Sequence, residues 1–257
     1  MDWLASYLLW ISLLLLLVSS LTKKSLIALS GWLLFGVFWL NQPGHYMAIN
    51  DYFNAILFAA AGLMCFYMAG IMTRRSGPSK AQLWASYAAA VCGMVYFPFA
   101  EIEPLREALI GFTTLMTVHA LQALSVPVSM PSWNIMTLNG RSVEIILACT
   151  AIESIALFSG LIISVRAPIG RRAAALAVSI ISIYILNLVR NGFVIMAYGW
   201  SWFGSASFEV AHNLIAKIGS VAALLLISYM IFLLLPELLS IIDELAADIR
   251  HPRGDAA

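Results

Sequence analysis

The distribution of hydrophobic residues along the chain predicts a series of membrane-spanning helices. A hydrocarbon core about 30 Å thick requires about 20 predominantly apolar residues in an α-helix. The stretch 25–40 is shorter than this, but its two tryptophans and two phenylalanines make it a credible span. Six longer stretches meet the requirement: 3–21, 52–73, 81–98, 142–165, 173–198 and 211–235. The pattern therefore predicts seven spans.

Two further segments have patterns that differ from those of the spans. Residues 105–124 mix charged and hydroxyl side chains with apolar ones, and prolines lie on both sides of the segment. We expect a re-entrant, tilted or surface-lying helix there; a full crossing, which would give eight spans, is the alternative. Residues 238–249 place apolar side chains on one helical face and acidic ones opposite, which indicates an amphipathic helix at the inner membrane surface.

Composition excludes several classes of protein. Of the 257 residues, 62% are hydrophobic and 11% charged, whereas soluble domains contain about 45–50% and about 25%. The net charge of +1 gives no polyanion-binding surface, so we expect no nucleic-acid partner. The three cysteines lie in apolar stretches and form neither a disulfide framework nor a zinc site. We predict an all-α polytopic membrane protein, residues 1–257 forming one integral membrane domain, with no metal and no cofactor.

The basic residues predict how the chain is oriented, because cytoplasmic loops collect Lys and Arg. If residues 105–124 crossed the membrane fully, the cluster of basic residues Arg166, Arg171 and Arg172 would face outside. Seven crossings with an outside N-terminus and a cytoplasmic C-terminus place all clusters inside. Ten of the fourteen basic residues form these clusters: Lys23, Lys24, Arg74, Arg75, Lys80, Arg166, Arg171, Arg172, Arg250 and Arg253.

Ionisable residues inside spans are functional candidates because burying them in lipid is costly. In the predicted topology, Cys149 lies about 10 Å and Arg190 about 12 Å below the outer ends of their spans. His212 opens the last span at the outer surface. These three residue types thus converge in the outer leaflet, on three different helices.

Together the three residues could perform nucleophilic catalysis by a thiol. A nearby cation favours the thiolate of Cys149, and Arg190 also suits an oxyanion. His212 is able to move the proton. Asn187 and Asn191 flank Arg190 and are candidates for holding the guanidinium or the substrate backbone. Glu153, four residues beyond Cys149, is a candidate partner for Arg190.

Each of these residues also has a structural interpretation. Cysteines in spans are commonly small packing residues, which we expect for Cys65 and Cys92. Arg190 would form a structural ion pair if Glu144 or Glu153 faced it. Lys217, one to two turns from His212, has a stem long enough to reach the interface.

Three segments resemble the exosortase/archaeosortase family, and most of all its archaeal branch acting on proteins with a PGF-CTERM tail. They are Leu147-Ala-Cys-Thr-Ala-Ile-Glu-Ser154, Asn187-Leu-Val-Arg-Asn191 and Val210-Ala-His-Asn213, in that order on successive spans. The likeness covers chiefly residues 140–240. Where some archaeal members carry a further basic residue, this chain has Ile227-Ser-Tyr-Met230 with no arginine.

The resemblance implies a sortase-like transpeptidase in a multi-pass cell-membrane protein, with its active site on the extracellular side. Cys149 would be the acyl-thioester nucleophile, Arg190 the proton donor or oxyanion stabiliser, and His212 the third basic member. The implied substrates are exported surface proteins whose C-terminal signal is a Pro-Gly-Phe motif, a transmembrane helix and a basic end. A phospholipid amine would be the acceptor, with membrane lipids as the surroundings.

Two other functions fit the same residues. An intramembrane cysteine protease without transfer would use the same side chains, and only the new C-terminus of the product distinguishes it from a transpeptidase. A small transporter or channel would need polar residues through the full membrane thickness. The inner ends of the candidate spans, 158–163 and 176–181, are largely apolar.

Overall fold

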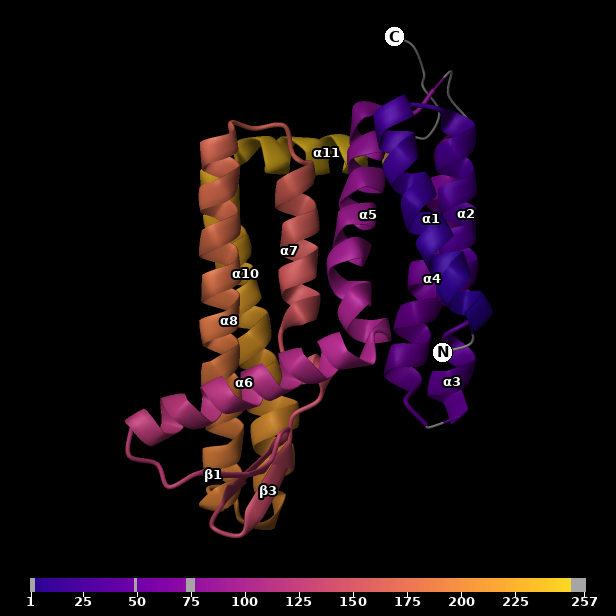
Figure 1. The fold of residues 1–257 in the computed structure, drawn as a ribbon. Helices are drawn as coiled ribbons and strands as arrows, with labels where there is room; N and C mark the ends of the chain where they lie inside the picture. Colours follow the sequence, from indigo (N-terminus) through magenta and orange to yellow (C-terminus); the bar gives the residue numbers. More distant parts are fainter. Residues whose placement is uncertain (1–2, 49, 73–76, 251–257) are drawn as a thin grey trace. The chain divides into compact units, whose positions relative to one another are not determined.

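The computed structural model describes residues 3–48, 50–72 and 77–250, and most of them are helical (Figure 1). The predicted all-α polytopic membrane protein is confirmed. The helices are α1 Trp3–Thr22, α2 Ser25–Leu40, α3 Pro43–Ala48, α4 Tyr52–Met72, α5 Lys80–Glu101, α6 Glu103–Ala123, α7 Ile152–Ser164, α8 Ile169–Gly199, α9 Ser207–Glu209, α10 Ala216–Leu234 and α11 Pro236–Arg250.

Six helical runs in the described residues are long and apolar enough to cross a membrane, judged by length and composition. They match six of the seven predicted spans: Trp3–Thr22, Ser25–Ala48, Tyr52–Met72, Lys80–Glu101, Ile169–Gly199 and Gly204–Leu234. The seventh, α7, is only 13 residues long. The orientation and the number of crossings stay predictions, and three of the basic residues that they use (Arg74, Arg75 and Arg253) lie outside the described residues.

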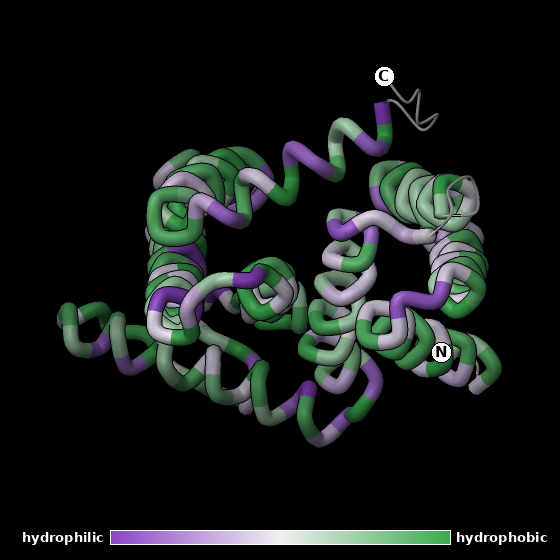
Figure 2. Tube along the Cα trace, turned by 90° about the horizontal axis from the view of Figure 1, so that it is seen from above, coloured by the Kyte–Doolittle hydropathy of each residue, from purple (hydrophilic) through white to green (hydrophobic). Residues whose placement is uncertain are grey.

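The chain forms two compact units. Unit 1 comprises residues 1–94, 159–167 and 236–257, and unit 2 comprises residues 95–158 and 168–235. In unit 1, α1 and α4 pack against α2 around the fully buried Leu9, Leu13 and Leu16. The amphipathic helix predicted at 238–249 is present as α11, along which hydrophilic and hydrophobic residues alternate (Figure 2).

Unit 2 is built on α8 and α10, which pack side by side (Figure 1). Arg171 Nη1 donates a hydrogen bond to the Leu234 carbonyl oxygen at 3.5 Å, so the start of α8 lies level with the end of α10. The helix α6 contacts α8 and runs across it rather than alongside it (Figure 1). Exposed apolar side chains on α8, such as Ile181 and Ile185, are the surface expected of a lipid-facing helix.

A small antiparallel sheet, which the sequence analysis did not predict, lies beside the C-terminal end of α8. Its strands are β1 Ser129–Ser132, β2 Ile135–Leu138 and β3 Arg141–Glu144, in the order β1-β2-β3. Asn139 and Gly140 join β2 to β3 with φ angles of 52° and 75°, as in the tight hairpin turns that favour Asn-Gly. Arg141 Nη1 donates to the Tyr198 carbonyl oxygen at 3.0 Å, which ties this hairpin to α8.

The predicted helical span at 142–165 is wrong in its first part. The strand β3 takes up the backbone hydrogen bonds of residues as far as Glu144, so the helix cannot begin there. A 3₁₀ turn over Leu147–Cys149 follows, and α7 begins only at Ile152. Neither Glu144 nor Cys149 is therefore in a membrane-spanning helix, and the depth of about 10 Å counted for Cys149 along such a helix does not hold.

The start of the last span also differs from the prediction. The helical run begins at Gly204 rather than near residue 211. Within it, Val210–Ile215 form a π-helical segment that contains His212. His212 therefore lies inside the run instead of opening it. Such π-helical segments are rare and are often found at functional sites.

Candidate active site

Two asparagine side chains hold the backbone of Cys149. Asn187 and Asn191 lie one turn apart on α8, and both are buried. Each donates from Nδ2 to the Cys149 carbonyl oxygen, at 2.7 Å and 2.9 Å. No hydrogen bond between these amides and the Arg190 guanidinium is found in the described residues, and their predicted role toward the guanidinium or the substrate backbone stays a prediction. Their contact fixes the loop that carries Cys149 against the helix that carries Arg190.

The loop after Cys149 has an unusual backbone. Thr150 is buried and its Oγ1 donates to the Leu147 carbonyl oxygen at 2.7 Å. Ala151 then has a φ of 63°, in the left-handed region that costs a non-glycine residue about 1–2 kcal/mol. Because this turn separates Cys149 from α7, the four residues between Cys149 and Glu153 do not form one turn of a continuous helix.

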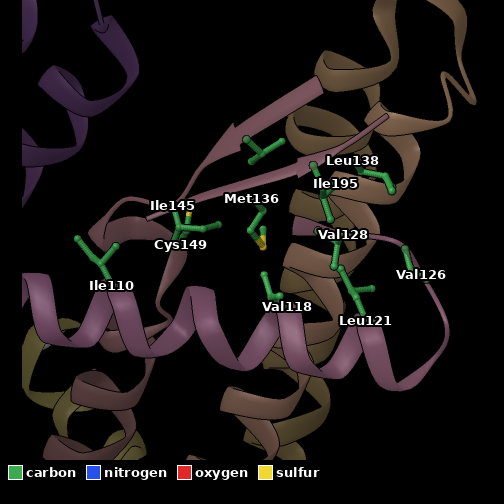
Figure 3. Close-up of a cluster of buried hydrophobic side chains, with 11 residues drawn as sticks. Ile110, Val118, Leu121, Val126, Val128, Met136, Leu138, Ile145, Cys149 and Ile195 are labelled. Atoms are coloured by element: carbon green, nitrogen blue, oxygen red, sulfur yellow. The ribbon is translucent and has the colours of Figure 1, made fainter. Parts of the chain in front are cut away.

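The Cys149 side chain lies in an apolar environment. It is 9% exposed and belongs to a cluster of buried hydrophobic side chains from α6, the sheet and α8 (Figure 3). Its neighbours there include Ile110, Met136, Ile145 and Ile195. The structure therefore places this thiol in a packed, shielded position.

A cavity of about 650 Å³ opens beside the Cys149 loop. Ala148 and Ala151 line it from the loop, while Cys149 itself does not. Ionisable side chains from three helices reach it, namely Glu153 of α7, Arg190 of α8 and Lys217 of α10. The other polar lining residues are Ser154, Asn187 and Ser220, and the remaining walls are apolar side chains of α8 and α10. Neither Ser154 nor Ser220 was predicted from the sequence.

Arg190 is available for a ligand in this cavity. Its Nε is buried and makes no hydrogen bond within the described part of the chain. A buried guanidinium N–H without a partner is costly, so a group that accepts its hydrogen bond would be stabilised there. The guanidinium also interacts electrostatically with the Glu153 carboxylate and the His212 imidazole. Arg190, Glu153 and His212 thus form a group of electrostatically interacting side chains.

His212 belongs to this group without lining the cavity. Its ring is half-buried and stacks on Phe208, with centroids 5.2 Å apart. The charges of Arg190 and Lys217 both act on it. Another candidate lies elsewhere: Glu144, on β3, accepts a hydrogen bond from Asn134 Nδ2 at 3.0 Å and does not line the cavity.

The two cations lie at similar heights along α8 and α10. Starting from the contact between Arg171 and Leu234, Arg190 is about 19 residues along α8, or ~28 Å. Lys217 is about 17 residues back along α10, or ~26 Å. Both distances approach the ~30 Å thickness of a hydrocarbon core. Arg190 lies nine residues before Gly199, the last residue of α8, and that end of the helix lies beside the sheet.

The sheet also bears on the extent of the hydrocarbon core. Open strand edges do not occur in the hydrocarbon region, because their backbone groups would lack partners. The β2–β3 hairpin contacts α8 at Tyr198 and Gly199, so that end of α8 lies outside the core. The cavity reaches as far as Phe193, six residues before Gly199 on the same helix.

Comparison with known proteins gives a family and two relatives. Residues 2–233 match the family described as transmembrane exosortase. A protein named archaeosortase A from Natronomonas pharaonis is 29% identical over 261 residues, which cover 87% of this chain and 82% of the relative. Another of that name, from Haloferax volcanii, is 28% identical over 250 residues, covering 84% and 82%. No solved structure matches significantly.

Proposed function

The chain belongs to the transmembrane exosortase family, and from this premise we propose that it is a membrane-embedded cysteine transpeptidase. Its substrates are exported surface proteins held in the membrane by a C-terminal tail of the PGF type. The enzyme cleaves this tail through an acyl-thioester and transfers the new C-terminus to a lipid amine. The names of the two relatives support the archaeal branch of the family.

One observation carries this proposal. The Cys149 carbonyl oxygen accepts hydrogen bonds from Asn187 and Asn191, and Arg190 lies between them on the same helix. The nucleophile candidate and the only arginine among the cavity-lining residues are therefore held in a fixed relation. A structural cysteine would not need two buried amides on its carbonyl oxygen.

The first half-reaction uses Cys149, Arg190 and His212. The Cys149 thiol turns out of the apolar cluster and gives its proton to the His212 imidazole, and the thiolate attacks the scissile carbonyl. The guanidinium of Arg190 stabilises the oxyanion that forms. When the C–N bond breaks, the imidazolium returns the proton to the leaving amine, and the acyl group stays on the sulfur.

In the second half-reaction a lipid amine attacks the thioester carbonyl. A C–N bond forms, the C–S bond breaks, and the departing thiolate takes a proton from the attacking nitrogen. If water attacks instead, the product has a free carboxyl group, which is the outcome expected of a protease without transfer. The shallow position of the cavity suits a substrate whose own membrane helix ends at the headgroup level.

The first prediction concerns the nucleophile. Cys149→Ala should abolish processing of a co-expressed substrate with a PGF-type tail, because no other group can form the thioester. Intact-protein mass spectrometry measures the substrate's C-terminus, and thermal unfolding in detergent checks that the variant folds. Cys65→Ala and Cys92→Ala are the matched controls, since these cysteines lie in unit 1 and should keep wild-type processing. Full activity of Cys149→Ala would refute the mechanism.

A further inference from the structure

Lys217 is a charged residue that the reaction steps above do not use. It lies in the apolar helical run Gly204–Leu234, and an ionisable residue in such a run is a candidate functional residue. Its side chain lines the cavity together with Arg190 and Glu153. Glu153 is likewise unused by those steps.

The charges of the cavity match a zwitterionic ligand. Lys217 and Arg190 are cations and Glu153 is an anion, so the cavity is left with one uncompensated positive charge. Arg190 is required for the oxyanion, which leaves Lys217 for an anionic group and Glu153 for a cationic one. Lysine is a common phosphate-binding residue because its ammonium acts as a compact point charge with three donors.

The rest of the cavity matches an apolar chain. Leu224 and Ile227 of α10 and Ile183 and Leu186 of α8 continue its walls away from the charged end. Lys217 lies about 26 Å from the level of Leu234, close to the ~30 Å thickness of a hydrocarbon core. That is the level of phospholipid phosphates, whose chains extend into the core. The position, the charges and the walls thus fit one molecule.

We propose that Lys217 binds the phosphate of an aminophospholipid, that Glu153 binds its ammonium group, and that its chains lie along the groove between α8 and α10. This lipid is the acceptor of the second half-reaction, so the proposal rests on the proposed transpeptidase. Lys217 becomes a specificity-determining residue for the acceptor, and Glu153 directs the amine to the thioester beside the Cys149 loop.

The proton balance of this step is complete with these residues. The lipid ammonium carries three protons and the product amide carries one. One proton leaves through the Glu153 carboxylate to water, which frees the lone pair of the amine. The second passes to the Cys149 thiolate as the C–S bond breaks. The enzyme therefore returns to its starting thiol and carboxylate.

The test compares two acceptors with the full-length enzyme in phosphatidylcholine nanodiscs. One acceptor is phosphatidylethanolamine; the other is a long-chain alkylamine, which has an amine and a chain but no phosphate. Lys217→Gln should raise the KM for phosphatidylethanolamine about tenfold and leave that for the alkylamine unchanged, because only the phosphate contact is lost. Lys217→Arg should restore the preference, and Lys80→Gln, in unit 1, is the matched charge control.

Lys217, which binds the phosphate, and Glu153, which binds the ammonium group, should respond differently in this test. Glu153→Gln should raise the KM for both acceptors, since both carry the amine that Glu153 binds. If Lys217→Gln raised the KM for both acceptors equally, or changed neither KM, the proposed phosphate contact of Lys217 would be wrong. The proposed transpeptidase activity would not be affected by that result. A free carboxyl product from the wild-type enzyme with every acceptor would instead refute transfer itself. An active Cys149→Ala variant would refute the proposed chemistry as a whole.

Discussion

Asn187 and Asn191 show how single side chains set the position of the candidate nucleophile. Two buried amides donate to one carbonyl oxygen, that of Cys149. Each hydrogen bond contributes about 1 kcal/mol, but leaving the buried carbonyl with no partner costs about 1–3 kcal/mol. The two amides are therefore coupled, because either one satisfies the carbonyl when the other is lost.

This coupling gives a prediction for four variants. Asn187→Ala and Asn191→Ala should each lower the free energy of unfolding by about 1 kcal/mol, and the double variant by more than the sum. Asn191→Asp should slow substrate processing more than Asn191→Ala, because a carboxylate oxygen would face the carbonyl oxygen. Denaturant unfolding in detergent and processing rates measure the two effects. Strict additivity, or an Asp variant as active as Ala, would contradict the arrangement.

The residues that form the candidate site were predictable by type but not by orientation. Cys149, Arg190 and His212 were identified because ionisable and nucleophilic residues are rare in so apolar a chain. The placement of the Cys149 thiol in an apolar cluster, outside the cavity, depends on tertiary packing. Position along a helix gives depth, whereas rotation about the helix axis depends on the neighbouring elements.

At the scale of elements, the spans followed from length and hydropathy, while the sheet did not. Its strands are only four residues long, which is too short for a clear alternation of apolar and polar side chains. The last strand, β3, also overlaps the start of the predicted span at 142–165. The signal that would have found them is Asn139-Gly140, the strongest short-range indication of a hairpin. The π-helical segment at Val210–Ile215 has no comparable sequence signature.

The contact between the sheet and α8 rests on a glycine. A Cβ added at Gly199 would come within 2.7 Å of Leu138 side-chain atoms on β2, so this helix and strand need a glycine to approach as they do. Gly170, at the other end of α8, has open space around its Cβ position. Gly170 and Gly199, near the two ends of one helix, thus make a matched pair.

Gly199→Ala should destabilise unit 2 by about 1–3 kcal/mol, because overpacking forces side chains or backbone to shift. Gly170→Ala should be neutral or stabilise α8 by up to about 1 kcal/mol, since alanine has the higher helix propensity. Thermal unfolding in detergent measures both. If the two variants melted alike, the close approach of Leu138 to α8 would not hold the sheet in place.

At the scale of the whole molecule, the two topologies predicted from the sequence differ in the role of α6. The segment at 105–124 is helical as α6, but it runs across α8 and is not among the candidate membrane spans of the described residues (Figure 1). A helix that lies across its neighbour does not carry the chain to the other side. The seven-crossing interpretation then keeps 166–172 on the cytoplasmic side with the other basic clusters, as the distribution of Lys and Arg requires.

Thiol labelling in intact cells distinguishes the two topologies. With seven crossings and an outside N-terminus, the hairpin turn at Asn139 is outside and Lys24 is cytoplasmic. With eight, both are cytoplasmic. In a cysteine-free background, Asn139→Cys should therefore react with a membrane-impermeant maleimide, while Lys24→Cys should react only after lysis. Both positions are exposed, so shielding by the protein does not explain a negative result. Protection of Asn139→Cys until lysis would mean that α6 crosses the membrane, and the cavity would then open to the cytoplasm, where an exported substrate cannot reach it.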